Sequence, residues 1–425
     1  MIPPKADLGL LMLVLLISLS DPVFGQDEQN LEIHGFLLGE LSVRPTDQRP
    51  GDEGPGDFLL GEERLRLDIF TWADSIEASA QFKADFLHDV VAGELDIDVR
   101  EAYVDYTTGD FDFRVGRQIA TWGVGDLLFI NDIFPKDWVS FFSGRPFEYL
   151  KRGVDALRSR YSSTAFNAEL LVIPFFTPDN LPTSERFFLF DPFAVVPVRD
   201  ERRPKKTFGN AELALRLYRR IGDFDVSLYA YKGFWPTPSM KPDSSPSPKR
   251  VTSFYPQRSV YGLSAQGSAL GGILSFESGY YHSRDDEDGN NPTIPNSQAR
   301  FLLGYQRQLW EDFTLGSQYS GEIMKEHGAF RQSLPTGFPS QKQYRDTITL
   351  SLEQLLKHQV WTLALFVFYS PADNDYLLQP HTSYKFSDDL SATLGANIFG
   401  GENETTFLGQ FDKNDNLFLS FRFDF

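Results

Sequence analysis

Short and long connections alternate along this chain, between segments whose apolar and polar residues also alternate. A period of two is the side-chain period of a β-strand. After even-numbered segments the connection has about four residues or fewer, as at 73–74, 108–110, 221–222, 311–312 and 387–388. After most odd-numbered segments it is long and rich in Pro, Gly, Asp and Ser, as at 44–57, 121–151, 176–207, 235–257, 285–297, 326–343 and 400–413. A two-sheet sandwich has no reason to sort its loops by strand parity, whereas a closed antiparallel barrel collects each kind at one end.

About 18 such segments can be drawn from the turn residues, and 16 is the nearest alternative because boundaries carry errors of about two to four residues. They are 31–43, 58–72, 75–88, 97–107, 111–120, 152–162, 164–175, 208–220, 223–234, 258–271, 272–284, 298–310, 313–325, 344–357, 358–370, 376–386, 389–399 and 414–425. We therefore predict an all-β fold, a closed antiparallel transmembrane β-barrel with short turns at one end and long loops at the other.

The two faces of each segment differ in polarity, as 75–88 illustrates. One face carries Ile76, Ala78, Ala80, Phe82, Ala84 and Phe86, and the other carries Glu77, Ser79, Gln81, Lys83 and Asp85. A barrel turns the first set to lipid and the second into a wet lumen. Because only alternate residues must be apolar, a hydrophobic fraction of 41% suits such a barrel. Aromatic residues beside the short turns predict a girdle at the lipid–water boundary, formed by Trp72, Tyr106, Phe111, Tyr161, Phe224, Trp310, Phe313 and Trp361.

The first 25 residues have the layout of a secretory signal peptide. Lys5 precedes an apolar stretch at 10–19, and Val23 and Gly25 supply small residues before the expected cleavage site. We expect residues 1–25 to be removed and 26–425 to form the barrel. The chain has no Cys, which excludes disulfides, covalent haem and thiolate metal sites, and no cofactor or metal is expected. The net charge of −19 argues against nucleic acid as a partner.

Two stretches resemble Gram-negative outer-membrane β-barrels. From Leu417 to Phe425 every second residue is apolar, which is similar to the closing strand of that class. Residues 115–118 read Val-Gly-Arg-Gln and 122–126 read Trp-Gly-Val-Gly-Asp. This pair resembles several porin-like families, including a large uncharacterised one with a Gly-Arg-Gln…Trp-Gly-X-Gly-Asp stretch.

The resemblance implies an integral protein of the bacterial outer membrane, with its short turns in the periplasm. It implies contact with outer-membrane lipid and lipopolysaccharide, and recognition of Phe425 by the barrel-assembly machinery. Whether the chain forms a homo-oligomer, and which small solute it meets, stays open at this stage.

Strand parity also predicts which charged side chains face the lumen. The candidates are Arg64, Arg66, Asp68, Lys83, Asp85, Glu101, Asp105, Asp112, Arg114, Arg158, Arg160, Glu212 and Arg216. The long loop 121–151 is too apolar to extend into water. We expect it to fold inward as a constriction rather than cap the rim or contact another subunit, with Trp122, Asp126, Phe129, Asp132 and Trp138 as its main residues. Loop 176–207, with aromatic residues at 187–193 and a basic run at 202–206, is a candidate lid.

These features favour a porin-like channel for passive or facilitated diffusion of small solutes through a mixed-charge lumen. Two alternatives remain, namely uptake of hydrophobic or amphipathic molecules and a non-conducting scaffold. An enzyme is not expected, because the six His are scattered and none lies in a nucleophile or zinc motif.

Overall fold

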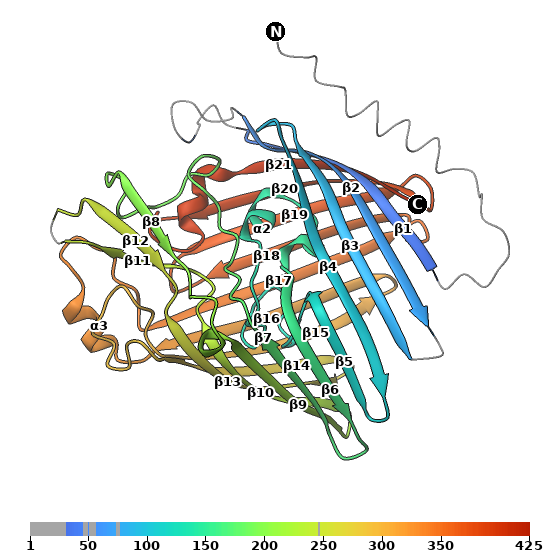
Figure 1. The fold of residues 1–425 in the computed structure, drawn as a ribbon. Coiled ribbons are helices and arrows are strands. Elements are labelled where there is room, and N and C mark those ends of the chain that lie inside the picture. Colours follow the sequence, from blue (N-terminus) through green and yellow to red (C-terminus); the bar gives the residue numbers. More distant parts are fainter. Residues whose placement is uncertain (1–30, 46–49, 51–56, 74–76, 245–246) are drawn as a thin grey trace, which may run out of the picture.

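A computed structural model describes residues 31–45, 50, 57–73, 77–244 and 247–425. The predicted signal peptide, the residues before Leu31 and part of the 73–74 turn lie outside these ranges. Eighteen strands form one sheet in which each strand is antiparallel to its neighbours, and Figure 1 shows the barrel that they build. Among the described residues, no helix is long and apolar enough to cross a membrane.

The barrel strands follow one another around the wall in chain order. They are β1 (Leu31–Val43), β2 (Phe58–Ala73), β3 (Ala78–Asp89), β4 (Glu94–Thr108), β5 (Phe111–Gln118), β6 (Val154–Ser162), β7 (Asn167–Ile173), β9 (Glu212–Ile221), β10 (Phe224–Phe234), β13 (Gln257–Ala269), β14 (Gly272–Ser283), β15 (Gln298–Trp310), β16 (Phe313–Met324), β17 (Tyr344–Leu356), β18 (Trp361–Ser370), β19 (Asp375–Lys385), β20 (Leu390–Gly401) and β21 (Asn416–Asp424).

The barrel closes between its first and last strands. β1 pairs with β2 along its whole length and with β21 from Phe36↔Asp424 to Val43↔Leu417. Beyond that ladder, the Gly35 N–H donates to the carbonyl of Phe425 at 2.9 Å, and the Phe425 N–H donates back at 3.0 Å. The closed 18-strand antiparallel barrel is therefore confirmed, and the alternative of 16 strands is wrong.

Alternation sets the two faces of the wall, as it does along any strand. Glu277 and Asn397 contact loop 121–151 inside the barrel, while their neighbours Phe276 and Ile398 are exposed on the other side. Most predicted girdle aromatics lie on the outward face. Trp72 does not, because it follows Arg64 and Arg66 in unbroken register on β2 and stacks on Phe70 inside the barrel.

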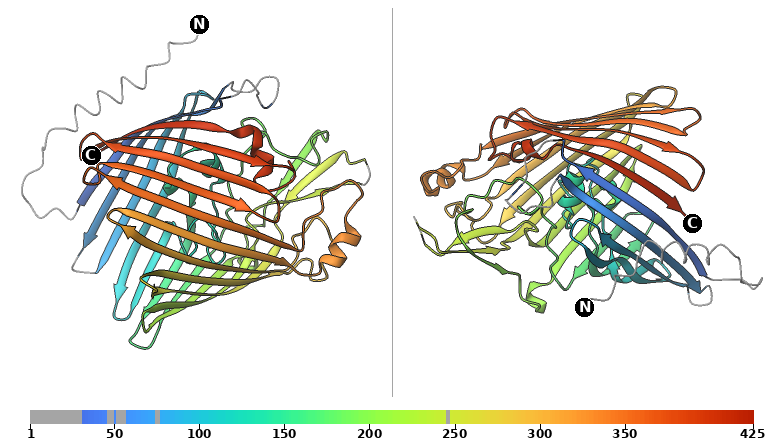
Figure 2. Two further views of the ribbon diagram at one scale, coloured as in Figure 1. Left: turned by 180° about the vertical axis from the view of Figure 1, so that it is seen from behind. Right: turned by 90° about the horizontal axis from the view of Figure 1, so that it is seen from above.

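Three further strands lie outside the barrel, in segments that the sequence presents only as loops. β8 (Val198–Arg202) pairs in parallel with β12 (Arg250–Phe254), which pairs antiparallel with β11 (Ser239–Pro242). Figures 1 and 2 show this small sheet and helix α3 (His327–Ser333) at the same end of the barrel. We call it the loop end, because the strands that are joined by the links 44–57, 119–153, 174–211, 235–256 and 402–415 begin or end there.

The apolar core lies inside the barrel and is built around loop 121–151. One cluster packs Trp122, Ile133 and Phe134 against the wall formed by β6, β7, β9, β10, β13 and β14. A second packs Phe141 and Phe142 of helix α2 (Trp138–Ser143) against β18, β19 and β20 on the other side. The loop therefore fills much of the space between two opposite walls.

Candidate functional site: the lumen and its internal loop

The charged residues predicted from parity all lie on the inward face of the wall. These are Arg64, Arg66, Asp68, Lys83, Asp85, Glu101, Asp105, Asp112, Arg114, Arg158, Arg160, Glu212 and Arg216. Strand β4 has a bulge opposite Lys83 and Ala84 of β3. The bulge lies on the N-terminal side of Glu101, so it changes the register only of β4 residues that precede Glu101 and leaves this assignment intact.

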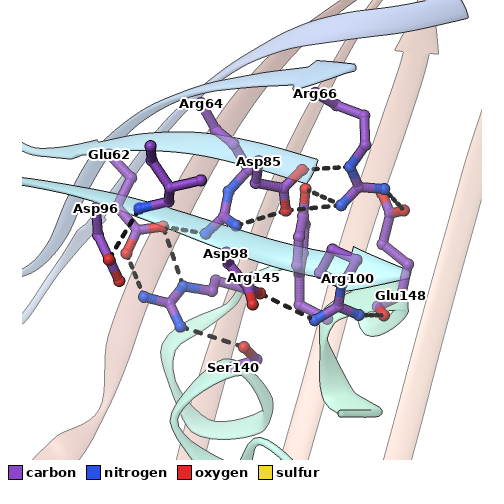
Figure 3. A network of polar contacts seen from close by, with 12 residues as sticks. Glu62, Arg64, Arg66, Asp85, Asp96, Asp98, Arg100, Ser140, Arg145 and Glu148 are labelled. Carbon is purple, nitrogen blue, oxygen red and sulfur yellow. Dashed lines mark hydrogen bonds and ion pairs between the residues drawn. The ribbon is translucent and has the colours of Figure 1, made fainter. Parts of the chain in front are cut away.

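Three of these residues, Arg64, Arg66 and Asp85, form with Glu62 and Arg145 a network that joins strands β2 and β3 to the internal loop (Figure 3). Arg64 donates to Asp85 at 2.9 Å and to Glu62 at 3.0 Å. Arg66 donates to the same Asp85 at 2.8 Å, and Arg145 of the loop donates to Glu62 at 3.1 Å. The Glu62 and Asp85 side chains are almost fully buried. Separating the members of such a network would leave buried charges uncompensated, which costs much free energy. The network therefore holds the loop against this wall.

The residues of η2 (Phe147–Leu150) extend this contact towards the closing strand. Glu148 pairs with Arg66 at 3.3 Å and with Arg422 of β21 at 2.9 Å. The Tyr149 ring lies under Arg64, 4.2 Å from the guanidinium carbon to the ring centroid, and its hydroxyl accepts from Arg66 at 3.1 Å. Stacking on an aromatic face attracts a guanidinium group electrostatically and also fixes its orientation.

Elsewhere in the lumen, most predicted charges pair across neighbouring strands. The pairs are Lys83 with Asp68 and Glu101 (3.3 and 3.2 Å), Arg114 with Asp105 (2.7 Å), Arg160 with Glu169 (2.9 Å) and Arg216 with the hydroxyl of Ser227 (3.1 Å). Glu212 is buried and accepts from the Tyr231 hydroxyl, and Asp112 accepts from Thr107 at 2.8 Å. The predicted lumen residues thus form local pairs along the wall rather than one assembled site.

The Trp-Gly-Val-Gly-Asp stretch wraps around a single buried carboxylate. Glu277 of β14 accepts from the backbone N–H groups of Val124 and Gly125, both at 3.1 Å, and from that of Asn131 at 2.6 Å. Gly123 has φ +81°, and a Cβ there would lie 2.6 Å from the Glu277 carboxylate. Gly123 is therefore required for the close approach of the loop to β14.

Trp122, the first of the predicted constriction residues, anchors the start of the loop. Its indole N–H donates to Glu169 at 2.7 Å, and its ring packs against Phe134 and Tyr229 with centroid distances of 5.2 and 5.5 Å. Asp126 lies further along at an exposed turn, where its N–H donates to Gln318 of β16 at 3.0 Å.

Asp132 forms the centre of a buried charge cluster within the loop. Its carboxylate pairs with Lys136 and Lys151, each at 3.2 Å. Burial lowers the pKa of the Lys136 ammonium, and Asp132 opposes that shift. Lys136 also donates to the carbonyl of Phe134 at 2.7 Å and lies over the Phe129 ring. These contacts hold the turn of the loop as a rigid unit.

Trp138 and helix α2 dock against the β18–β21 wall. The Trp138 ring packs on Phe142, Phe129 and Phe407. The helix is capped by Asp137, whose side chain accepts from the Ser140 N–H at 2.9 Å. At the C-terminal end of the helix, three side-chain amides of the wall donate hydrogen bonds to its backbone carbonyl groups. Asn416 donates to Phe142 at 3.1 Å, Asn397 to Phe142 at 3.4 Å and Gln379 to Phe141 at 3.5 Å.

Loop 176–207 crosses the loop end and meets strands far from its origin. Near its start, this loop contacts the internal loop: Asp179 accepts from the backbone N–H of Lys136 at 2.8 Å and from the indole N–H of Trp138 at 3.2 Å. Its far part reaches the link between β20 and β21. There Phe188 exchanges two hydrogen bonds of 2.8 Å with the side-chain amide of Asn414, and Phe187 is buried.

Several residues that hold the loop were not singled out from the sequence, above all Glu277, Gln379, Asn397 and Asn416. Parity alone places them inside, as it places every second residue of a strand. Their partners are backbone groups more than a hundred residues away, so no local pattern marks them. Within the described part of the chain, no group of three or more His, Cys, Asp or Glu is arranged to hold a metal.

No family model matches the chain, and no curated protein matches it. Among solved structures, the fold resembles OccK11 (OpdR) of Pseudomonas aeruginosa, with a TM-score of 0.53 and 8% identity over 93% of this chain and 95% of that one. A loop L8 deletion mutant of OmpT, an outer membrane protein of Vibrio cholerae, gives 0.45 and 11% identity over 93% and 99% of the two chains. A mutant of the Rh. blastica porin gives 0.43 and 13% over 93% and 100%. The structural neighbours are outer-membrane β-barrels, and the likeness to OccK11 concerns the fold alone.

Proposed function

We propose that this chain is an outer-membrane, porin-like channel for small solutes, and that loop 121–151 is its constriction. One observation carries the proposal. The loop leaves the wall after β5, crosses the interior, is bound by strands on every side and rejoins the wall at β6. The wall around it is lined by charged and polar groups, which is the chemistry that a water-filled lumen requires.

The outward face supports a place in a membrane. Exposed apolar side chains lie on strands all around the barrel, among them Val115, Leu228, Leu303 and Leu394. In the orientation that we propose for the barrel in the membrane, the short turns would lie in the periplasm and the loop end would lie outside the cell. The basic residues at 202–206 would then meet lipopolysaccharide phosphates, and loop 176–207 would act as a lid.

Planar-bilayer recording of the purified, folded protein tests the channel. We expect discrete conductance steps for the natural chain. Glu277→Gln replaces an acceptor of three N–H groups by a group that is itself a donor on one side, so it should loosen residues 123–131 and raise the conductance or its noise. The matched control is Glu353→Gln on β17, an exposed carboxylate on the inward face, which should leave the steps unchanged.

A closed, non-conducting barrel is the second candidate, and the dense apolar packing on both sides of the loop favours it. The same recording separates the two. If neither the natural chain nor Glu277→Gln conducts, although both are folded, the channel proposal fails and a scaffold role takes its place.

A further inference from the structure

A cavity of about 350 Å³ lies at the loop end, between loop 121–151 and strands β15 to β19. One wall of it is apolar and consists of Leu127, Leu128, Phe129 and Trp138, with Phe407 from the link between β20 and β21. These side chains rest on the buried cluster beneath them. Even so, the four loop residues are only half-buried, and Phe407 is 52% exposed. An apolar surface held rigidly beside an aqueous space is typical of a ligand site.

The opposite wall carries charged groups of both signs. Arg300 of β15 pairs with one oxygen of Glu322 at 2.9 Å, and Arg345 of β17 pairs with the other. Two guanidinium groups therefore share one carboxylate. Arg300 also donates to Gln298 at 3.1 and 2.6 Å, so the N–H donors that remain for a further acceptor are mainly those of Arg345.

An acceptor lies on the same wall, in the link between β18 and β19. The Asp373 N–H donates to Ser370 at 3.3 Å, but its carboxylate accepts no hydrogen bond from any residue within the described ranges. Partial burial raises the pKa of Asp373, against the influence of Arg345. A cationic group placed beside this carboxylate would compensate for the lost solvation. The neighbouring Asp375 is already committed to the N–H groups of Leu408 and Gly409.

We propose that this cavity is a binding subsite for a zwitterionic solute with an apolar side chain, that is, an apolar α-amino acid. The carboxylate of the solute would bind Arg300 and Arg345, its ammonium group would face Asp373, and its side chain would lie on the apolar wall. The volume is within the range of about 300–1,000 Å³ in which proteins hold small ligands. The inference rests on the proposed channel function and specifies the class of solute that the channel selects.

The test uses the folded protein in planar bilayers and in liposomes. Addition of L-phenylalanine should reduce the KCl current in a saturable manner, whereas glycine, which lacks the apolar side chain, should have little effect. Phenethylamine lacks the carboxylate and N-acetylphenylalanine lacks the ammonium group, so each should bind about tenfold more weakly or worse. Liposome swelling then reports whether phenylalanine also enters faster than its size predicts.

Variants on each wall sharpen the test. Arg345→Gln and Phe129→Ser should each raise the half-saturating concentration of phenylalanine about tenfold, while the folded band on gels persists. Arg307→Gln, on the same strand as Arg300 but on its outward face near the short turn, is the control for loss of an arginine from this strand and should behave as the natural chain.

Two results would overturn the inference. One is equal behaviour of phenylalanine and glycine in a conducting barrel, and the other is undiminished binding of both single-charge analogues. If the barrel does not conduct at all, the channel proposal fails instead. Calorimetric titration of the detergent-solubilised protein with phenylalanine then decides the subsite by itself, since binding does not need a pore.

Discussion

At the scale of single residues, the face of the strand on which a residue lies decides how much a substitution destabilises the barrel. Leu350 and Ser351 are neighbours near the middle of β17, and they lie on opposite faces. Leu350 is paired with the outward Val367, and Ser351 is paired with the inward Phe366. The same substitution at these two sites therefore enters two different solvents, lipid and lumen.

We expect Leu350→Arg to destabilise the inserted barrel by about 2–4 kcal/mol, since a charged side chain near the bilayer midplane must leave water. Ser351→Arg should cost less than about 1 kcal/mol, because its guanidinium stays in the lumen. Urea unfolding in lipid vesicles, read on gels by the band of the folded form, measures both. Equal losses at the two sites would show that β17 does not have this register.

At the scale of elements, long loops act here as packed parts of the core. Loop 121–151 is held by buried carboxylates and amides of the wall. The middle of loop 176–207 is held by the Asn414 amide, together with the Arg186–Asp89 ion pair and the buried ring of Phe187. Asn414 is fully buried, and both polar atoms of its side chain are used by the backbone of Phe188. Local order in a loop of this kind depends on a few such contacts.

Asn414→Ala should loosen the middle of loop 176–207 around Phe188 without opening the barrel. Two partly buried backbone groups of Phe188 lose their partners, at about 1 kcal/mol each, and the loop should become at least several-fold more sensitive to limited proteolysis. Thr405→Ala is the control, because the Thr405 hydroxyl bonds only to Asn403 within its own link. Unchanged cleavage in Asn414→Ala would mean that other contacts hold this loop.

At the scale of the whole molecule, the barrel depends on the seam between β1 and β21. Gly35 lies at the end of this seam, and a Cβ there would lie 2.6 Å from the ring of Phe425 and collide with the carbonyl of Arg66. Gly39, four residues further along the same strand, has open space around the corresponding position.

Gly35→Val should therefore impede closure, with an overpacking cost of about 1–3 kcal/mol, whereas Gly39→Val should be tolerated. The fraction of chain that migrates as the compact, unheated form on denaturing gels gives the measurement. A normal compact fraction for Gly35→Val would show that the seam is not closed as described.

Strand number, strand order and the facing of wall residues were determined by the sequence alone. Period-two alternation is a local property, and the parity of the links orders the strands without any long-range information. That is why all 13 predicted lumen charges lie inside, from Arg64 to Arg216. Trp72 is the exception among the aromatics, since nearness to a turn says nothing about the face on which a ring lies.

Only the tertiary structure decided what fills the barrel. The loop's apolar composition indicates that it must be buried, but its partners, Glu277 on β14 and the amides of β19 to β21, are distant in sequence. The sheet formed by β8, β11 and β12 arises in the same way, by pairing of segments from two different long loops. Such contacts depend on which side chains closure brings face to face across the lumen, and no pattern within a single segment records that.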